Sequence, residues 1–312
     1  MTGRGEPSVL VFGADSMVGS DFVARLQGSV AAAGRVHPAD RGLRVERFHP
    51  VDLSLPAAVG ELVRSAPEPT VVNFAARTDV DGVERERGVP TENAWVVNAL
   101  APEAIARAAA EVGKRFIQLS TDFVFDGTNG PYGEEAARAP FSDRLSWYGW
   151  TKSEGERRAA LADRTLAIVR IAYPYRAGFP AKLDFARWIL AKRRDGTLPS
   201  LYGDQQITPT WVPDVTETLQ ALLARPNSGT FHVASPETTT PWEFGTELVR
   251  VAEGAAPGLP RSELAAVPSG SGRAPRPLRG GLVSRRVREL GVRLTSWREG
   301  IGRLVREEGG LR

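Results

Sequence analysis

The sequence contains no cysteine, only three histidines and only four lysines among its 40 basic residues. The absence of cysteine excludes disulfide bonds, thiolate nucleophiles and cysteine-based metal sites. The three histidines (His37, His49 and His232) are scattered without the spacing of metal ligands, so no metal site is predicted. The Gly-x-Ser-x-Gly motif of α/β-hydrolases is also absent. Zinc chemistry and hydrolysis by an activated serine or thiol therefore find no support.

Long apolar runs and blocks of like charge are missing as well. No apolar run approaches the roughly 18 residues of a membrane span. The polar residues 1–7 are not followed by the apolar segment that a signal peptide needs. The formal charge is +3, and the basic residues are mixed with acidic ones. We therefore expect a cytoplasmic protein that binds neither membranes nor nucleic acid, and a mildly basic pocket for a phosphorylated ligand fits this charge.

Short apolar runs alternate with amphipathic stretches through the first half of the chain. Strands that are apolar on both faces are typical of a buried parallel sheet, and their alternation with helices indicates a doubly wound α/β fold. The strand candidates are residues 9–12, 70–74, 116–119 and 166–171, and the helix candidates are residues 18–26 and 94–112.

The second half of the chain is less regular and richer in Pro, Gly and Trp. It holds one clear helix candidate (214–224), a long loop (257–281) and a partly helical stretch (282–305). We predict a Rossmann dinucleotide-binding domain over residues 1–172, with a return segment at about 206–235. Residues 173–312 are expected to form mainly a smaller substrate-binding domain that closes over the nucleotide.

The first strand candidate leads directly into residues 13–19 (GADSMVG) and then a helix. In this context Gly13 permits a tight turn, the helix N-terminus offers amide groups to a pyrophosphate, and Gly19 allows close packing of helix against strand. Ser16 stands where a central glycine is common, but it is small and can cap the helix. The loop therefore favours dinucleotide binding.

Two further positions bear on the cofactor. Asp52 could accept a hydrogen bond from an adenine amino group or could simply cap the following helix, and the sequence does not separate these readings. The end of the second strand, which decides between NAD and NADP, is expected within residues 36–41. There Asp40 would repel a 2′-phosphate and Arg41 would attract one, and on balance we favour NADPH.

Tyr148 and Lys152 lie four residues apart at the start of a helix candidate, and therefore on one helical face. With five tyrosines and four lysines in 312 residues, such a pair is rarely met by chance. Addition of hydride to a ketone leaves an alkoxide that must take a proton. A phenol beside an ammonium group can supply that proton, because the ammonium lowers the pKa of the phenol. The alternative is a surface helix with an ordinary tyrosine.

Polar residues follow the strand candidate at 116–119. Ser120, Thr121 and Asp122 would lie at the carboxyl edge of the sheet, where ligands bind in open α/β folds. A hydroxyl there could polarise a substrate carbonyl, although such residues often only form turns. His232 is read as a strand residue near the sheet rather than a catalyst. Trp150 and Trp211 could line a ligand cleft or pack in the core.

Together and in order, these motifs resemble the extended short-chain dehydrogenase/reductase family, most closely its dTDP-4-dehydrorhamnose reductase group. The resemblance covers nearly the whole chain, and its most specific motifs are residues 120–127 (STDFVFDG), 148–156 (YGWTKSEGE) and 208–211 (TPTW). Residues 73–76 (NFAA), Asn98, Arg170, Tyr173, Asp214 and the loop 273–277 also match the group. The stretch 141–147 before Tyr148 is longer than is usual in the family.

The resemblance implies reduction of a keto-deoxysugar nucleotide by NADPH or NADH. Thr121 would bind the keto oxygen, Tyr148 would donate the proton, and Lys152 would orient the cofactor and tune Tyr148. A dTDP-linked keto-sugar is the implied substrate, and a homodimer is a further expectation. The expected cofactor contacts are Gly13, Asp15, Ser16, Met17, Val18, Gly19, Asp40, Arg41, Asp52, Leu53, Phe74, Ala75, Ala76, Thr78, Asn98, Ser120, Tyr148, Lys152 and Tyr173. The expected substrate contacts are Asp122, Val124, Phe125, Tyr148, Tyr173, Thr210, Trp211 and Arg273.

Two other functions fit the same motifs. A dinucleotide-binding regulatory subunit without turnover would share the fold, but it would have no need of the Tyr148–Lys152 pair. An epimerase or dehydratase would recycle its cofactor instead of consuming it. Dehydratases of the wider family carry an Asp-Glu pair after the threonine, whereas this sequence has Asp122 and Phe123. The sequence therefore favours simple reduction.

Overall fold

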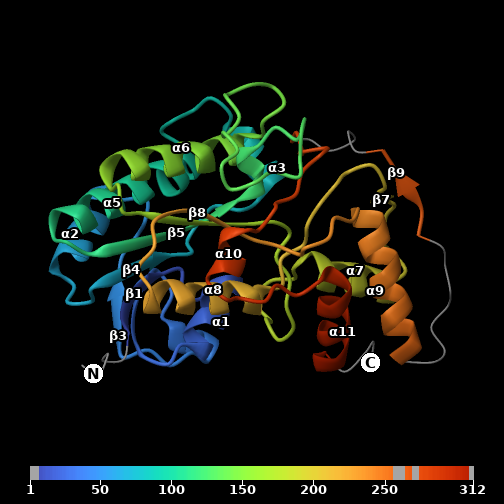
Figure 1. The fold of residues 1–312 in the computed structure, drawn as a ribbon, viewed down its shortest axis with the longest axis horizontal. Coiled ribbons are helices and arrows are strands. Elements are labelled where there is room, and N and C mark those ends of the chain that lie inside the picture. The colour runs from blue at the N-terminus through green and yellow to red at the C-terminus, as the bar shows by residue number, and fades with distance from the viewer. Residues whose placement is uncertain (1–6, 256–263, 269–273, 309–312) are drawn as a thin grey trace.

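A seven-stranded parallel sheet forms the middle layer of the larger part of the molecule (Figure 1). The structure is a computed structural model that describes residues 7–255, 264–268 and 274–308. The strands lie side by side in the order β3-β2-β1-β4-β5-β6-β8, and a separate parallel pair joins β7 to β9. The strands are β1 (Ser8–Phe12), β2 (Ser29–Gly34), β3 (Arg47–Pro50), β4 (Thr70–Asn73), β5 (Arg115–Thr121), β6 (Ala167–Ile171), β7 (Leu201–Tyr202), β8 (Gly229–Val233) and β9 (Ala266–Val267).

The central strands are buried on both faces, as their continuous apolar runs predict. Every residue of β4 and β6 is buried, and so are the last four residues of β1. These strands coincide within one or two residues with those expected from the sequence. The strand β2 has the sequence SVAAAG, which carries no clear strand pattern, and it ends earlier than the expected residues 36–41.

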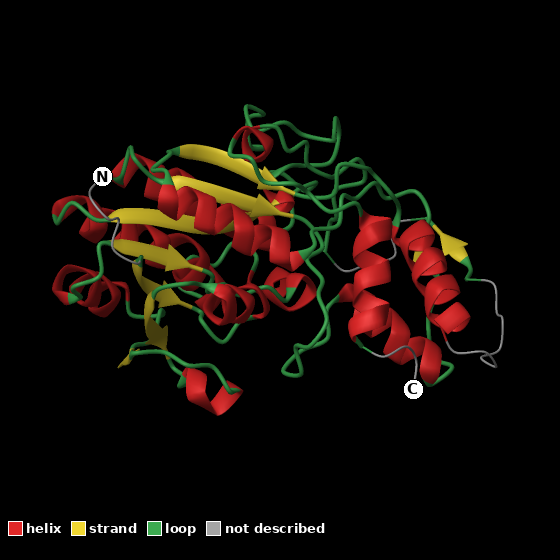
Figure 2. Ribbon diagram, turned by 60° about the horizontal axis from the view of Figure 1, so that its bottom comes forward, coloured by secondary structure: helices red, strands yellow, loops and turns green. Residues whose placement is uncertain are grey.

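Two layers of helices cover the sheet (Figure 2). The helices α1 and α8 pack together on one face, and α2, α5 and α6 pack on the other. The longer helices are α1 (Met17–Arg25), α2 (Pro56–Ser65), α5 (Ala101–Glu111), α6 (Trp147–Ala162), α7 (Phe185–Arg194), α8 (Val212–Ala224), α9 (Pro241–Ala255) and α11 (Trp297–Glu307). The short helices are η1 (Pro38–Arg41), α3 (Val80–Val83), η2 (Glu84–Glu86), α4 (Asn93–Trp95), η3 (Val96–Leu100), η4 (Asp122–Val124) and α10 (Arg286–Glu289).

A second apolar core lies beside the sheet, between α7, α9 and α11. The helices α7 and α9 were not predicted, although both have readable start signals. Asp184 caps α7 by accepting a hydrogen bond from the Arg187 amide at 3.0 Å. The α9 helix begins with a capping box, in which Thr240 accepts from the Glu243 amide at 3.0 Å and Glu243 accepts from the Thr240 amide at 3.2 Å. This second core packs α9 against α7 and α11.

The α/β fold with a parallel Rossmann-type sheet confirms the predicted fold class. His232 lies in β8 and is fully buried, as expected for a strand residue. The division between the two predicted domains at residues 172 and 173 stays a prediction. Because all seven strands run parallel, their carboxyl ends meet at one edge, and β1, β4, β5 and β6 end there beside each other.

Candidate active site

A cavity of about 670 Å³ lies along the carboxyl edge of the sheet, a volume typical of ligand pockets. One end is formed by the loop after β1, and the middle by the ends of β4, β5 and β6. Its lining residues are Gly13, Asp15–Val18, Gly34–Val36, Asp52, Leu53, Phe74–Thr78, Val80, Asn93, Val97, Leu119–Phe123, Tyr148, Lys152, Ile171, Tyr173, Pro174, Phe179, Lys182–Phe185 and Arg276. Most of the predicted cofactor contacts and all three predicted catalytic residues are among them.

The loop between β1 and α1 has the geometry of a phosphate cradle. Gly13 adopts a φ of +72°, and a Cβ atom there would lie 2.7 Å from the Ala75 amide nitrogen. A Cβ atom at Gly19 would lie 2.2 Å from the Gly13 carbonyl oxygen, so Gly19 serves close packing and does not line the cavity. Ser16 caps α1 by accepting a hydrogen bond from the Gly19 amide at 3.0 Å. The amino end of α1 therefore faces the cavity with its positive dipole end.

The end of β2 corrects the prediction for Asp40 and Arg41. The strand ends at Gly34, and both residues lie further on in the exposed helix η1, outside the cavity lining. The residue that follows the strand and lines the cavity is Arg35. The cation at the end of the second strand is therefore Arg35, six residues before the predicted Arg41.

Asp52 forms a local turn and also lines the cavity, and its contact with an adenine stays a prediction. Its carboxylate accepts a hydrogen bond from the Ser54 amide at 2.8 Å, as in a local turn, and the residue also lines the cavity. The hydrogen bonds with Ser54 hold the pKa of Asp52 below its usual value, and the charge of Arg35 acts in the same direction. The group is thus an anionic hydrogen-bond acceptor at this end of the cavity.

The three predicted catalytic residues come together from two elements. Thr121 is the last residue of β5, whereas Tyr148 and Lys152 lie one turn apart on α6, which begins at a Ser146 cap. The Thr121 side chain lies near enough to the Tyr148 hydroxyl to lower the pKa of that hydroxyl. Lys152 donates a hydrogen bond from Nζ to the Leu119 carbonyl oxygen at 2.9 Å, which fixes α6 against β5. All three side chains are buried and line the same cavity.

The ionisation of Tyr148 differs from the expectation. Burial raises its pKa above the ordinary value, the charge of Asp122 adds to this, and only the contact with Thr121 opposes it. The Lys152 ammonium donates its hydrogen bond to the Leu119 carbonyl, and burial is the largest influence on the phenol. The phenol is therefore kept protonated, which is the state that a proton donor needs.

Burial lowers the pKa of Lys152 to about 8, and the charge of Glu156 opposes this shift. Burial also raises the pKa of Asp122 to about 7, against hydrogen bonds that include one from the Gly281 backbone. Two groups that line the cavity thus titrate near neutral pH, as is common in active sites.

Tyr173 is held in a strained conformation at the cavity wall. Within the described residues, Tyr173 is the one non-glycine residue with a positive φ, of 43°. Its hydroxyl donates to Gln205 Oε1 at 3.1 Å, and its ring meets the Phe185 ring edge to face at 5.4 Å. These contacts aim the side chain into the site beside Asp122.

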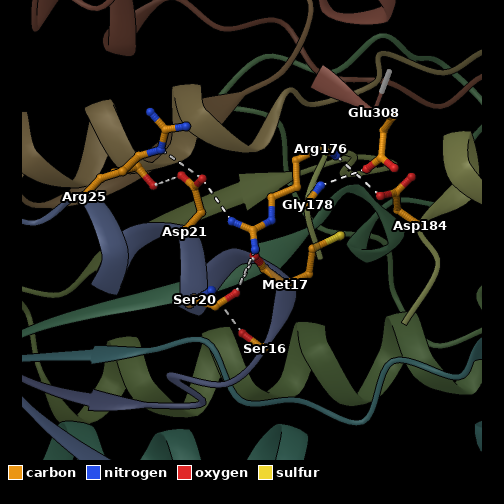
Figure 3. Close-up of polar contacts among 11 residues, drawn as sticks. Ser16, Met17, Ser20, Asp21, Arg25, Arg176, Gly178, Asp184 and Glu308 are labelled. Atoms are coloured by element: carbon orange, nitrogen blue, oxygen red, sulfur yellow. Dashed lines mark hydrogen bonds and ion pairs between the residues drawn. The ribbon is translucent and has the colours of Figure 1, made fainter. Parts of the chain in front are cut away.

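Residues 174–184 form a strap along the opposite wall of the cavity, and Phe179, Lys182 and Leu183 on it line the cavity. Figure 3 shows how Arg176 joins the strap to α1. Its guanidinium donates to Asp21 Oδ1 at 3.0 Å and to Ser20 Oγ at 3.1 Å. The strap is thereby attached to the same helix that begins at the phosphate loop.

Arg276, in the loop before α10, lines the cavity. The predicted contact Arg273 lies outside the described residues, and Arg276 was not predicted. The Arg276 guanidinium lies 2.8 Å from Asp81 Oδ2, and Asp81 also accepts from the Ala274 amide at 3.1 Å. This pair joins the loop to α3, and the Arg276 cation lines the cavity.

Five other predicted contacts are not among the residues that line the cavity, and their contacts with cofactor or substrate stay predictions. Asn98 is buried and bonds the Arg77 amide at 2.8 Å and the Thr151 hydroxyl at 3.1 Å, so it supports the wall without forming it. The other four side chains are apolar or carry a hydroxyl, and they are buried in the core. The four core residues are Val124, Phe125, Thr210 and Trp211.

Two further observations concern the described residues as a whole. In 7–255, 264–268 and 274–308, no group of three or more His, Asp or Glu side chains is placed to hold a metal ion. Over the same ranges, none of the helices has the length and apolar character that crossing a lipid bilayer requires.

Comparisons with known proteins show which family the chain resembles. The family model described as RmlD substrate binding domain matches residues 7–309. A probable low-salt glycan biosynthesis reductase of Haloferax volcanii is 34% identical over 260 residues, covering 82% of this chain and 83% of that protein. The dTDP-4-dehydrorhamnose reductase of Escherichia coli is 31% identical over 314 residues, covering 96% and 97%.

A similar fold is found in the dTDP-4-dehydrorhamnose reductase of Bacillus anthracis, solved in complex with NADP. It is 23% identical, with a TM-score of 0.78 and coverage of 97% of this chain and 99% of that one. The extent of the family match and the sequence identities confirm the resemblance seen in the motifs. The chain therefore belongs to the RmlD substrate binding domain family, the dTDP-4-dehydrorhamnose reductase group of the extended short-chain dehydrogenases/reductases.

Proposed function

We propose that this protein uses NADPH or NADH to reduce the keto group of a dTDP-linked keto-deoxysugar. One observation carries the proposal: Thr121, Tyr148 and Lys152 line the same cavity as the phosphate loop at Gly13. A proton donor and a dinucleotide cradle are thus placed at one site. The names of the relatives support the same substrate class.

The residues at the β1 end of the cavity fit a dinucleotide. A pyrophosphate would lie at the amino end of α1, where the missing side chain of Gly13 leaves room for close approach. Asp52 would accept a hydrogen bond at the adenosine end, and Arg35 would contact the ribose there. When bound, the reduced nicotinamide supplies a hydride.

The chain's own residues would manage the oxygen of the ketone. The Thr121 hydroxyl would bind the keto oxygen, and the protonated Tyr148 phenol would give its proton to the alkoxide that hydride addition leaves. Lys152 would place a positive charge behind the phenol as it loses its proton. Arg276 would attract the diphosphate of the substrate.

Reduction is favoured over dehydration by the residue after Asp122. Phe123 packs against Tyr148, with ring centroids 5.6 Å apart in an edge-to-face arrangement. An apolar ring therefore occupies the position where the dehydratases of the wider family carry a second acid. Phe123 cannot move a proton at a neighbouring carbon.

The choice between NADPH and NADH is predicted to depend on Arg35. Replacing Arg35 with Ala should raise the KM for NADPH by about tenfold or more and leave that for NADH nearly unchanged, because a charged hydrogen bond to the 2′-phosphate is lost. The KM values for both cofactors measure this. Arg41→Ala is the matched control, since Arg41 is exposed on η1, and it should change neither. An equal effect of both substitutions would contradict the assignment.

The strap is predicted to support cofactor binding through Arg176. Replacing Arg176 with Met should raise the Kd for NADPH about fivefold or more, because the strap loses its link to α1. Arg25→Met is the matched control, since Arg25 also pairs with Asp21, at 3.0 Å, but does not contact the strap. Quenching of tryptophan fluorescence by NADPH gives both Kd values. If both variants bind NADPH with the same Kd as the protein without substitutions, the strap does not support cofactor binding.

The direct test of the function is a steady-state assay with dTDP-4-keto-6-deoxysugars. Reduced-nicotinamide absorbance should fall in proportion to the sugar added. An epimerase or dehydratase would change the sugar without net loss of absorbance. A regulatory subunit would leave both unchanged and would co-purify with another enzyme. The homodimer expected from the family stays a prediction, which sedimentation or light scattering can test.

A further inference from the structure

A buried ion pair lies one helical turn beyond Lys152. Glu156 follows Lys152 by four residues on α6, and both side chains are almost fully buried, with exposed fractions of 1% and 5%. Arg170 on β6 binds Glu156 through two hydrogen bonds, of 2.9 Å and 2.6 Å. The Glu156 carboxylate thus stands fixed on the helical face that carries Tyr148 and Lys152 toward the cavity.

The surroundings of Glu156 contain few other charges. Arg138, from the loop before α6, reaches to 3.6 Å from its carboxylate. His232 on β8 contacts Arg170 at 3.4 Å, and burial lowers the pKa of its ring to about 3, so it is neutral. Other titratable groups on α6 or on elements packed against it include Asp122 and Tyr148 at the cavity, Asp81 on α3, which pairs with Arg276, Glu103 on α5, which pairs with Arg158, and Glu84 on η2, which pairs with Arg87.

We propose that Glu156, fixed by Arg170, is a positioning residue for the reduction, and that its carboxylate keeps the buried Lys152 side chain charged. The inference rests on the proposed function, because Lys152 acts there as a cation. It adds a residue that does not touch the cavity: Glu156 is absent from the lining and acts through Lys152.

The physical reason is the burial of the ammonium group. Removing a charged amine from water favours its neutral form, and burial is the largest influence on Lys152. The hydrogen bond to the Leu119 carbonyl supplies no negative charge. Glu156 is the charged group that raises the pKa of Lys152 against burial. Without Glu156, the pKa of Lys152 would be lower, and Lys152 would lose its proton at a lower pH.

The test measures the ionisation of Lys152 directly. The chain has four lysines, so NMR of protein labelled with ¹³C at lysine Cε can follow each of them, with Lys152→Met assigning the signal. Glu156→Gln should move the Lys152 midpoint down by about one pH unit from its position near pH 8. The alkaline limb of kcat/KM for keto-sugar reduction should move by the same amount.

Glu154→Gln is the matched control. Glu154 lies on the same helix, but it pairs with Arg157 at 2.8 Å and Arg158 at 3.5 Å. The Glu154→Gln substitution should change neither the Lys152 titration midpoint nor the alkaline limb of kcat/KM. An equal shift from Glu154→Gln would overturn the inference, because a general change in α6 would then explain it.

A second variant protects the test against misfolding. Glu156→Gln alone leaves the Arg170 charge buried, whereas the double variant Glu156→Gln with Arg170→Met removes both charges at similar volume and should fold. Its Lys152 midpoint should also lie below that of the unchanged protein. An unchanged midpoint in both variants would overturn the inference. The Lys152 titration needs no substrate and therefore tests only the inference about Glu156. If the protein without substitutions does not reduce any keto-sugar, the proposed function is wrong, whatever the titration shows.

Discussion

Replacing Tyr148 with Phe is expected to lower kcat for keto-sugar reduction by about 10²–10⁴-fold, the usual contribution of a general acid. The substitution removes only the hydroxyl that contacts Thr121, and the ring can keep its edge-to-face packing on Phe123. The Kd for NADPH should therefore stay within about twofold of the unchanged value. Stopped-flow turnover and fluorescence titration measure the two quantities separately.

The matched control for this substitution is Tyr132→Phe. The Tyr132 hydroxyl also makes a hydrogen bond, to Asp126 at 3.1 Å, but Tyr132 does not line the cavity. Its loss should leave kcat nearly unchanged. Full turnover by the Tyr148→Phe variant would show that the alkoxide takes its proton from another group, and the proposed role of Tyr148 would be wrong.

Replacing Lys152 with Met is expected to lower kcat/KM by about 10²-fold or more, because the phenol then loses its proton with no cation behind it. Met fills a similar volume, and removing a desolvated charge does not weaken the core, so the Tm should not fall. The unchanged enzyme has a related pH dependence. The pKa of Lys152 is lowered to about 8, so kcat/KM should decline as the pH rises through 8.

Lys114→Met is the matched control, since Lys114 is also partly buried and donates to backbone carbonyls, among them Val63 O at 2.6 Å. It lies outside the cavity lining and should not change kcat/KM. A Lys152→Met variant with full activity, or a pH profile with no decline near 8, would remove Lys152 from the reaction.

The parts of the site that the sequence predicted are those built from local spacing. The phosphate loop needs a glycine turn between a strand and a helix, and the Tyr148–Lys152 pair needs only one helical turn. Both are complete within a few residues, so pattern and chemistry can be read together. The burial of β1, β4 and β6 followed in the same way from their apolar runs.

The parts that were missed depend on where distant segments meet. The Ala-rich strand β2 has no alternating pattern, because β1 and β3 flank it and helices cover the sheet, so its end could not be placed and Arg35 was overlooked. Trp211 was assigned to the cleft, yet it packs against Tyr175 in the core between α7 and α9. An aromatic side chain serves either place equally well, and only tertiary packing decides.

Ionisation was the least predictable property of the site. The sequence places an amine near a phenol, but it does not show that Lys152 points to the Leu119 carbonyl or that burial dominates both groups. The link from Glu156 to Arg170 joins a helix to a neighbouring strand, and its effect on Lys152 becomes visible only once both are placed.

The central claim is that hydride passes from the reduced nicotinamide to the keto carbon of a sugar nucleotide in this cavity. NADPH that carries deuterium at the transferable position tests this directly, with mass spectrometry of the sugar product. The account predicts one deuterium atom in each product molecule, on the carbon that held the ketone, and one equivalent of oxidised cofactor. A product without deuterium, or cofactor oxidation without a reduced sugar, would contradict it.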